Sequence, residues 1–339
     1  MQFSCKTKKL IQKVTKNRKQ IKLTIGILHK GEQQFRLFDS DGETSYTSHL
    51  YEIGSITKVF TTSLFAKYLE KGAMHLDDSI AQYIPTFKDL NYYPTLKRLA
   101  THSAGYPTLY PMTRSDSRKA VMRMYFTRET VTLSDYLTMD AQKMTDLANH
   151  TKLQDKEYKW KYSNYGMALL GHAVAAVEDK EIWSLMNDYL INELELTNSF
   201  MGTDSSEILA GYDVKNREIP NWNWQNGANL ASCAGAISST AEDLLAFAKM
   251  NLDQVPSYLS LCHKKYTDGC KHFSMGLGWW IDKKNPDIFF HGGNTEGFSS
   301  MLAFDKKKNS AVVILANVQH FKEREALFMD ILENIPSNI

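Results

Sequence analysis

Strand-like segments lie at both ends of this chain, whereas helical patterns fill its middle. The strand-like runs are rich in β-branched and aromatic residues and lie at 22–28, 34–38, 288–291, 299–304 and 311–315. Between about residues 76 and 235, helical patterns and irregular loops dominate, as at 165–177 and 182–194. Because each element must bury its apolar face, the economical solution is one antiparallel sheet drawn from both ends, with a helical region inserted.

The sequence therefore predicts an α+β fold, an α/β sandwich with helices flanking the sheet. Residues 1–75 and 236–339 are expected to form the sheet domain, and residues 76–235 a mostly helical domain. Further helices are expected at 59–69, closed by Gly72, and at 321–334, ahead of Pro336. An active site is expected in the cleft between the two parts.

Composition excludes several functional classes. The 339 residues are 43% hydrophobic and 23% charged, and 40 basic against 38 acidic residues give no general argument for nucleic-acid binding. No apolar run of about 20 residues predicts an integral membrane segment. No apolar leader follows the basic start, so the sequence predicts a cytoplasmic location, or a secreted or surface-attached one if a leader was removed.

The four cysteines make no Cys-x-x-Cys pair, and no paired-histidine spacing accompanies them. The sequence therefore predicts no metal site and no cofactor. Cys262 and Cys270 would be close enough in sequence to bridge in an oxidising compartment, but without a leader free thiols are expected.

The first 31 residues carry basic charges and no acidic ones. Phe3, Leu10, Ile11 and Val14 suit one face of a helix. One interpretation is contact with a membrane surface or a polyanion. The favoured one is an amphipathic helix packed on the sheet with its lysines in water, because the apolar face is narrow.

Ser55-Ile56-Thr57-Lys58 is the segment that carries chemistry. A serine and a lysine three apart on a helix share one face, which suits a nucleophile whose proton a neighbouring amine takes or steers. Chance supplies about one such spacing in a chain of this length. Its weight therefore depends on Tyr162-Ser163-Asn164, before the helix at 165–177, and on His291-Gly292-Gly293, at the end of a strand.

With these motifs the chain resembles the serine β-lactamase and penicillin-binding-protein superfamily. The resemblance is to its class C-like branch of esterases, D-amino-acid peptidases, carboxypeptidases and class C β-lactamases. Further matching segments, in family order, are Leu99-Ala100-Thr101-His102-Ser103-Ala104-Gly105-Tyr106-Pro107, Ala234-Gly235-Ala236-Ile237-Ser238-Ser239-Thr240-Ala241-Glu242-Asp243-Leu244 and Met275-Gly276-Leu277-Gly278-Trp279. The match extends over most of residues 20 to 335.

The resemblance implies a role for each motif residue. Ser55 would form an acyl-enzyme, with Tyr162 as principal base and Lys58 as its electrostatic partner. Free tyrosine and lysine have pKa values of about 10 and 10.4, so which of the two holds the proton stays open at this point. Asn164 would hold Lys58 and donate to the substrate. The backbone amides of Ser55 and Asn294 would form the oxyanion hole, and Gly292 and Gly293 would let a substrate approach.

The third motif departs from β-lactamases, which usually have Lys-Thr-Gly where this chain has His291-Gly292-Gly293. An imidazole expected to titrate near neutrality replaces a permanent ammonium. This favours an ester or a peptide-like amide over a β-lactam as substrate. Four loop aromatics have two open interpretations, as the lining of a substrate pocket or as packing inside the fold. They are Tyr106, Tyr110, Trp222 and Trp224.

Three functions follow. The leading hypothesis is a serine hydrolase that cleaves a small ester or a D-amino-acid or peptide-like amide through an acyl-enzyme. Its expected partner is this small-molecule or peptide-like acyl substrate, and the sequence leaves the oligomeric state open. The second is a β-lactamase or a penicillin-sensitive D-Ala-D-Ala carboxypeptidase. The third, from another class, is a non-catalytic scaffold or binding module of the same fold. Substrate choice is expected to depend on loops at 106–160 and 212–230.

Overall fold

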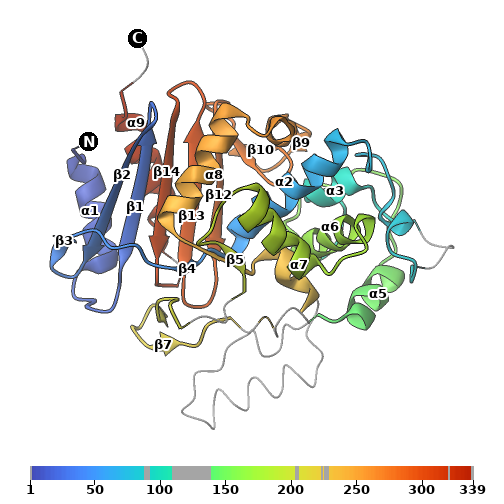
Figure 1. Ribbon diagram of the computed structural model, residues 1–339, viewed down its shortest axis with the longest axis horizontal. Helices are drawn as coiled ribbons and strands as arrows, with labels where there is room; N and C mark the ends of the chain where they lie inside the picture. Colours follow the sequence, from blue (N-terminus) through green and yellow to red (C-terminus); the bar gives the residue numbers. More distant parts are fainter. Residues whose placement is uncertain are drawn as a thin grey trace, which may run out of the picture.

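The computed structural model describes residues 2–87, 92–108, 139–202, 206–222, 224, 229–319 and 321–336. Its centre is a nine-stranded antiparallel sheet in the order β3-β2-β1-β14-β13-β12-β11-β10-β9 (Figure 1). The strands are β1 (Leu23–His29), β2 (Glu32–Asp39), β3 (Gly42–Thr44), β9 (Thr267–Asp268), β10 (Phe273–Met275), β11 (Trp280–Asp282), β12 (Ile288–Asn294), β13 (Ser299–Asp305) and β14 (Ser310–Ala316). The predicted sheet built from both chain ends is confirmed, and β1 pairs with β14 from Leu23↔Ala316 to His29↔Ser310.

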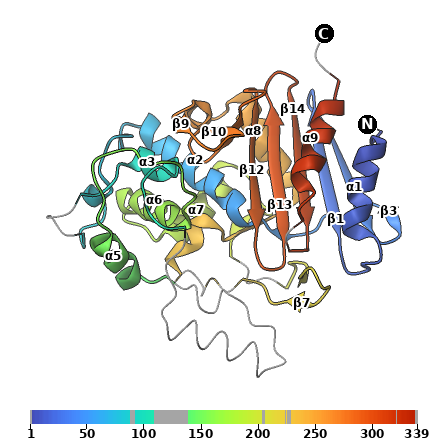
Figure 2. The ribbon, with the colours of Figure 1, turned by 180° about the vertical axis from the view of Figure 1, so that it is seen from behind.

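Helices cover both faces of this sheet, as the α/β sandwich predicts. On one face α8 (Ala241–Asp253) packs on β1, β13 and β14. On the other face α9 (Arg324–Asn334) packs on β13 and β14, and it lies beside α1 (Cys5–Thr15) (Figure 2). One hydrophobic cluster lies under α1 and α9, and a second joins the α8 face to the helical region.

The amphipathic interpretation of the N-terminal segment is confirmed. Ser4 caps α1 by accepting from the Thr7 amide at 2.9 Å. Leu10, Ile11 and Val14 are buried, while the lysines of the helix are exposed. The helix is stable here because its apolar stripe is covered by β1, β2 and α9.

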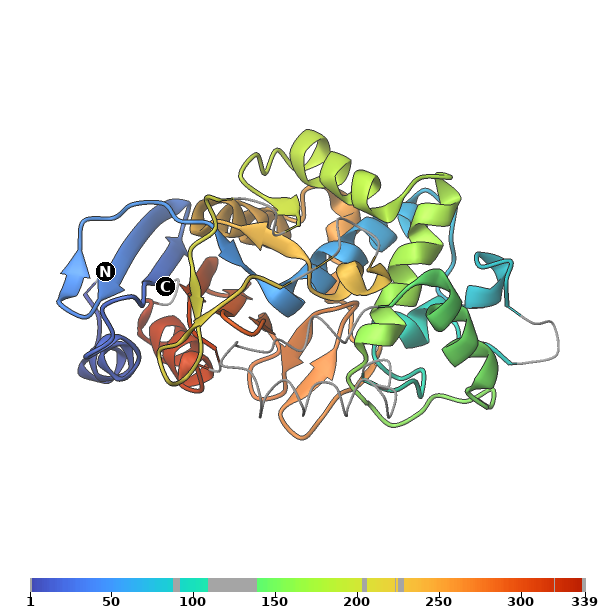
Figure 3. The same cartoon turned by 90° about the horizontal axis from the view of Figure 1, so that it is seen from below.

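The inserted helices lie at one end of the sheet, away from both termini (Figures 1 and 3). They are α3 (Leu96–Ala100), α5 (Ala141–His150), α6 (Asn164–Val177) and α7 (Ile182–Asp188), and they surround α2 (Thr57–Glu70). Gly72 closes α2 as expected: it has φ +68°, and its amide donates to Leu69 O at 3.1 Å while that of Ala73 donates to Tyr68 O. The proposed boundaries of the two domains stay a prediction.

Two predicted helices differ from the structure at their ends. The helix expected from residue 321 begins at Arg324, and the segment 182–194 continues from α7 as a π-helical turn, η4 (Tyr189–Glu193). The sequence also missed short pairings. One is a three-stranded sheet in the order β4 (Tyr51–Glu52), β8 (Ile237–Ser239) and β5 (Phe200–Met201). The other is a two-stranded sheet of β6 (Gly211–Tyr212) and β7 (Glu218–Ile219). Such strands are too short to show a period-two pattern.

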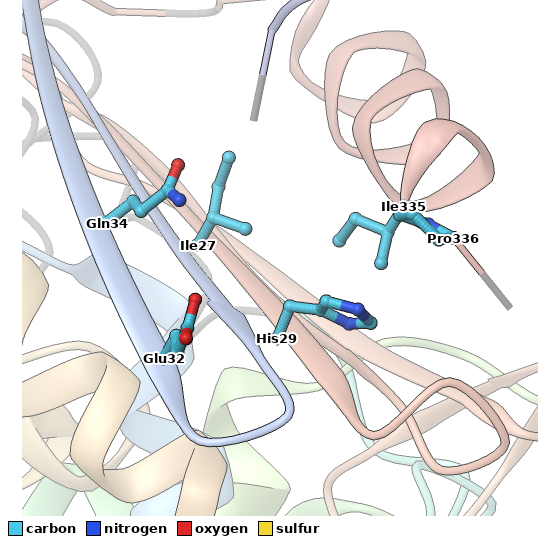
Figure 4. Close-up of a pocket in the computed structure, with 6 residues that line it drawn as sticks. All are labelled: Ile27, His29, Glu32, Gln34, Ile335 and Pro336. Atoms are coloured by element: carbon cyan, nitrogen blue, oxygen red, sulfur yellow. The ribbon is translucent and has the colours of Figure 1, made fainter. Parts of the chain in front are cut away.

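A hollow of about 250 Å³ lies between the hairpin of β1 and β2 and the end of α9 (Figure 4). Its lining includes Ile27, His29, Ile335 and Pro336. Ile27 and Ile335 belong to the cluster under α1 and α9, so this hollow is separate from the nucleophile segment, which packs into the other cluster. Within the described ranges, no helix has both the length and the apolar character needed to cross a membrane.

Candidate active site

Ser55 lies in a short 3-10 turn, η1 (Gly54–Ile56), that leads directly into α2. Gly54 has φ +52°, and a Cβ there would lie 2.7 Å from Asn294 O. The turn therefore needs glycine for two reasons, its left-handed backbone and its close approach to β12. This packing brings the Ser55 segment against the end of the His291–Asn294 strand, 236 or more residues later in the chain.

Lys58 is fully buried, and its Nζ lies 3.0 Å from Ser55 Oγ. The same Nζ donates to Ala234 O at 2.6 Å and lies 4.8 Å from the centre of the Tyr162 ring. Burial lowers the pKa of Lys58 well below its ordinary value. The amine is therefore suited to be neutral, with a lone pair near the Ser55 hydroxyl.

Tyr162 approaches from the segment before α6. Desolvation raises the pKa of its phenol, and the Ser55 hydroxyl and the Arg324 guanidinium only partly oppose that rise. A phenolate is therefore disfavoured in the resting site. The resemblance implied that Tyr162 is the principal base. These two pKa directions argue against that role and favour the Lys58 amine as the base.

The start of α6 holds the second motif in place. Ser163 is the N-cap: its Oγ accepts from the Gly166 amide at 2.8 Å and donates to Pro107 O at 2.7 Å. The Ser163 amide in turn donates to His102 Nδ1 at 3.2 Å. His102 is buried and lies 4.6 Å from the Tyr162 ring, centre to centre, which agrees with a structural role.

Asn164 does not hold Lys58 in this structure. Ala234 O accepts from Lys58 Nζ instead, and no hydrogen bond joins Lys58 to Asn164 in the described part of the chain. The buried Asn164 Oδ1 has no partner there. An unpaired buried acceptor is costly, so this amide is available to a substrate or a water.

The third motif forms the other wall. β11 pairs with β12 only at Phe289 and Phe290, so the strand from His291 to Asn294 extends beyond its neighbour. A Cβ at Gly293 would lie 1.9 Å from Ile53 O, and only glycine permits this contact with the nucleophile segment. The structure thus gives Gly293 a packing reason that the sequence did not.

His291 corrects an expectation. Its side chain is fully buried, its ring centre lies 4.6 Å from that of the tilted Trp280 ring, and Nδ1 donates to Gly292 O at 2.8 Å. Burial lowers the pKa of His291 well below its ordinary value. This lowered pKa favours a neutral imidazole at neutral pH and argues against the expected titration near neutrality.

Arg324, at the start of α9, is a site residue that the sequence analysis missed. Its Nη1 donates to Gly293 O at 2.6 Å and to Asn294 Oδ1. Its Nη2 would lie 3.3 Å from a Cβ at Gly292. No motif marks this arginine, and only the packing of α9 on β13 and β14 brings it to the end of β12.

The four aromatic candidates have different positions. Tyr106 is 1% exposed and packs on Tyr165, so it belongs to the core and does not line an open pocket. Trp222 is half-buried, and its ring centre lies 5.5 Å from that of the buried Trp224. Tyr110 lies outside the described residues.

The four cysteines are free thiols, as expected. Cys262 and Cys233 are buried, and burial raises the pKa of Cys233 to about 12, which makes it an inert thiol at neutral pH. Among the residues that the structure describes, no group of three or more His, Cys, Asp and Glu side chains is arranged to hold a metal ion.

Comparisons with known proteins agree with this geometry. A family model described as Beta-lactamase matches residues 7–333. "Protein flp" of Staphylococcus aureus (strain NCTC 8325 / PS 47) is 25% identical over 290 residues, 79% of this chain and 53% of that protein. The chain thus spans about half the length of this relative. A "Beta-lactamase" of Pseudomonas fluorescens is 23% identical over 343 residues, 87% of this chain and 88% of that one.

Solved structures show the same fold. The "Beta-Lactamase/D-Alanine Carboxypeptidase from Pseudomonas syringae" superposes with a TM-score of 0.77 at 21% identity, over 98% of this chain and 97% of that one. "A class C beta-lactamase" gives a TM-score of 0.76 at 17% identity over the full length of both chains. The predicted α+β class and the β-lactamase/transpeptidase-like fold are confirmed.

Proposed function

The chain belongs to the β-lactamase family, and on that premise we propose that it is a serine hydrolase acting through an acyl-enzyme on Ser55. Its substrate is a small ester or a peptide-like amide that contains a D-amino acid. The observation that carries the proposal is the buried Lys58 amine, with lowered pKa, 3.0 Å from the Ser55 hydroxyl. A lysine of this kind is a competent general base for a serine.

The proposed reaction has two halves, acylation and deacylation of Ser55, and Lys58 and Tyr162 each transfer one proton in each half. The Lys58 lone pair takes the Ser55 proton as Oγ attacks the acyl carbon. The Ser55 and Asn294 amides stabilise the oxyanion. The neutral Tyr162 phenol donates to the departing oxygen or nitrogen, the leaving group departs, and a water then attacks the acyl-enzyme by the reverse proton path.

Arg324 favours the peptide-like amide over a simple ester. Its guanidinium has donors beyond the two that it gives to Gly293 and Asn294, and it lines a hollow of about 260 Å³ with Asn294, Phe321, Lys322 and Glu325. A carboxylate on the leaving group would meet this cation. This also supports the second candidate, a carboxypeptidase or β-lactamase, since one structural neighbour is described as a β-lactamase/D-alanine carboxypeptidase.

The neutral His291 argues against efficient β-lactam hydrolysis. It provides no permanent positive charge where β-lactamases of this family usually have a lysine. We therefore expect slow nitrocefin turnover or a persistent penicilloyl adduct, with faster cleavage of acyl substrates that have flexible leaving groups.

The test is labelling of Ser55 by a fluorophosphonate probe. Wild type should be labelled and Ser55→Ala should not, with both proteins folded by circular dichroism. Equal labelling would refute the assignment. A panel of p-nitrophenyl esters, D-amino-acid peptides with free or amidated C-termini, and nitrocefin then ranks the substrates. A folded protein that reacts with none of these would support the scaffold alternative.

A further inference from the structure

Glu52 is a buried carboxyl, three residues before Ser55, that the proposed reaction does not use. It ends β4, pairs with Ser238 of β8 and is 2% exposed. Its Oε1 accepts from the Trp222 amide at 2.9 Å. An ionised carboxylate at such a depth is costly unless its environment supports it.

Two residues of the turn between β12 and β13, Thr295 and Glu296, also act on Glu52. Thr295 and the Trp222 amide favour the ionised carboxylate, whereas burial and the nearby Glu296 favour the protonated one. Burial dominates and raises the pKa of Glu52 to about 7. In the part of the chain that the structure describes, Glu296 is the charged group whose field acts on Glu52.

The hydrogen bond from the Trp222 amide connects Glu52 to the surroundings of the active site. Trp222 lies against Trp224, whose ring would be 3.1 Å from a Cβ at Gly235. The residue before Gly235 is Ala234, the acceptor for Lys58. These contacts link Glu52, through the Trp222–Trp224 pair, to the backbone next to the Lys58 acceptor.

We propose that Glu52 is a positioning residue whose ionisation sets the Trp222–Trp224 wall and so selects the acyl part of the substrate. The ionised carboxylate accepts a charge-assisted hydrogen bond from the Trp222 amide and fixes this wall. The protonated carboxyl accepts a weaker bond, and the wall relaxes to admit a larger acyl group. The selection of substrate rests on the proposed function of Ser55, whereas the movement of the wall does not.

The wall is tested first without catalysis, in a Ser55→Ala protein. The Glu52 carboxyl carbon, labelled with ¹³C and assigned by Glu52→Gln, should titrate with a midpoint near 7. The Trp222 indole signal, assigned by Trp222→Phe, should shift with the same midpoint. Glu296→Gln should lower both midpoints, and Glu242→Gln, which removes a carboxylate bonded to Tyr46 and Ser48, should leave them unchanged.

Selection is then tested in the active protein with p-nitrophenyl butyrate and octanoate. The ratio of the two kcat/KM values should change about fivefold across the same midpoint. It should be flat in Glu52→Gln and displaced in Glu296→Gln. An indole signal that does not follow the Glu52 titration, or a flat ratio in wild type, overturns the proposal. Loss of ester cleavage with the indole shift intact would instead count against the function of Ser55.

Discussion

At the residue scale, burial determines the chemistry of the site. Lys58 and His291 lose their charges for the same reason, because each cation would lie in a poorly solvated place. Tyr162 keeps its proton because desolvation disfavours the phenolate. A neutral amine beside a serine hydroxyl is the result, and sequence spacing alone does not specify it.

Replacing Lys58 with arginine should abolish the base while keeping a cation. A guanidinium stays protonated in proteins, so kcat/KM should fall about 10²- to 10⁴-fold. Lys67→Arg, in the same helix and ion-paired to Glu193, is the matched control and should keep wild-type activity. In wild type, kcat/KM should fall toward acidic pH as the lowered pKa of Lys58 is crossed. A Lys58→Arg protein with normal turnover would contradict the role.

His291→Gln should leave the pH dependence of kcat/KM in place. The imidazole is neutral over the neutral range because its pKa is lowered, so replacing it with a neutral amide removes no titration there. The measurement is a pair of pH–rate profiles between about pH 5.5 and 8.5. An inflection near pH 6.5 that is present in wild type and missing in the variant would show that His291 titrates after all.

At the level of secondary-structure elements, two local contacts hold the catalytic groups together. One is the N-cap of α6, where Ser163 links Tyr162 and Asn164 to the loop that contains His102. The other is the contact of η1 with the end of β12, which depends on Gly54 and Gly293. Each contact involves only a few residues, and each connects segments that are distant in sequence.

Ser163→Ala should destabilise the protein by about 1 kcal/mol, the usual cost of losing an N-cap. It should also lower kcat/KM, because Tyr162 precedes the cap directly. Asp140→Ala removes the N-cap of α5, which bonds the Lys143 amide at 2.8 Å, and serves as control. Both free energies of unfolding are measured in urea. Equal loss of activity in the two variants would mean that the α6 cap has no special link to the site.

Gly293→Ala should separate the nucleophile segment from β12. The added Cβ would lie 1.9 Å from a backbone oxygen, which cannot give way, so the strand or the turn must shift. We expect a cost of about 1–3 kcal/mol and loss of fluorophosphonate labelling. At Gly292 the nearest atoms are the flexible ends of Met301 and Arg324, so Gly292→Ala should be milder. A labelled, stable Gly293→Ala protein would refute the steric argument.

At the scale of the whole molecule, the two ends of the chain form one structural unit. β1 pairs with β14, and α1 packs on α9. Asp330 of α9 is 5% exposed and accepts from Ser4 and Thr7, and it is ion-paired to Lys6 at 3.2 Å. Burial alone would raise the pKa of Asp330, but these donors outweigh it and hold the pKa below its ordinary value.

Asp330→Asn should lower the free energy of unfolding by about 1–3 kcal/mol at pH 7. Because the folded pKa is depressed, the carboxylate stabilises above the unfolded pKa, and this contribution is lost as pH falls through the folded pKa. The difference between the two proteins should therefore shrink in acid. Asp253→Asn, which breaks an exposed pair with Lys249, should cost at most about 1 kcal/mol. A larger loss for Asp253 than for Asp330 would contradict the argument.

The sequence alone was sufficient to predict the strands at both ends, the helices between them and the nucleophile segment. These follow from local periodicity, turn residues such as Gly72, and motif spacing, all of which a short stretch of chain contains. For the same reason it missed the pairings of β4 with β8 and of β6 with β7, which are two or three residues long.

The roles of the residues inside the site depend on how distant segments pack together. Charge states depend on burial, and burial depends on all the elements that surround a group. Local sequence patterns therefore do not predict that Lys58 and His291 are neutral. Arg324 reaches Gly293 because α9 packs against the sheet. Ala234 replaces Asn164 as the partner of Lys58 because a 3-10 helix, Leu230–Ala234, packs beside α2. Such long-range contacts arise from packing, which no single segment encodes.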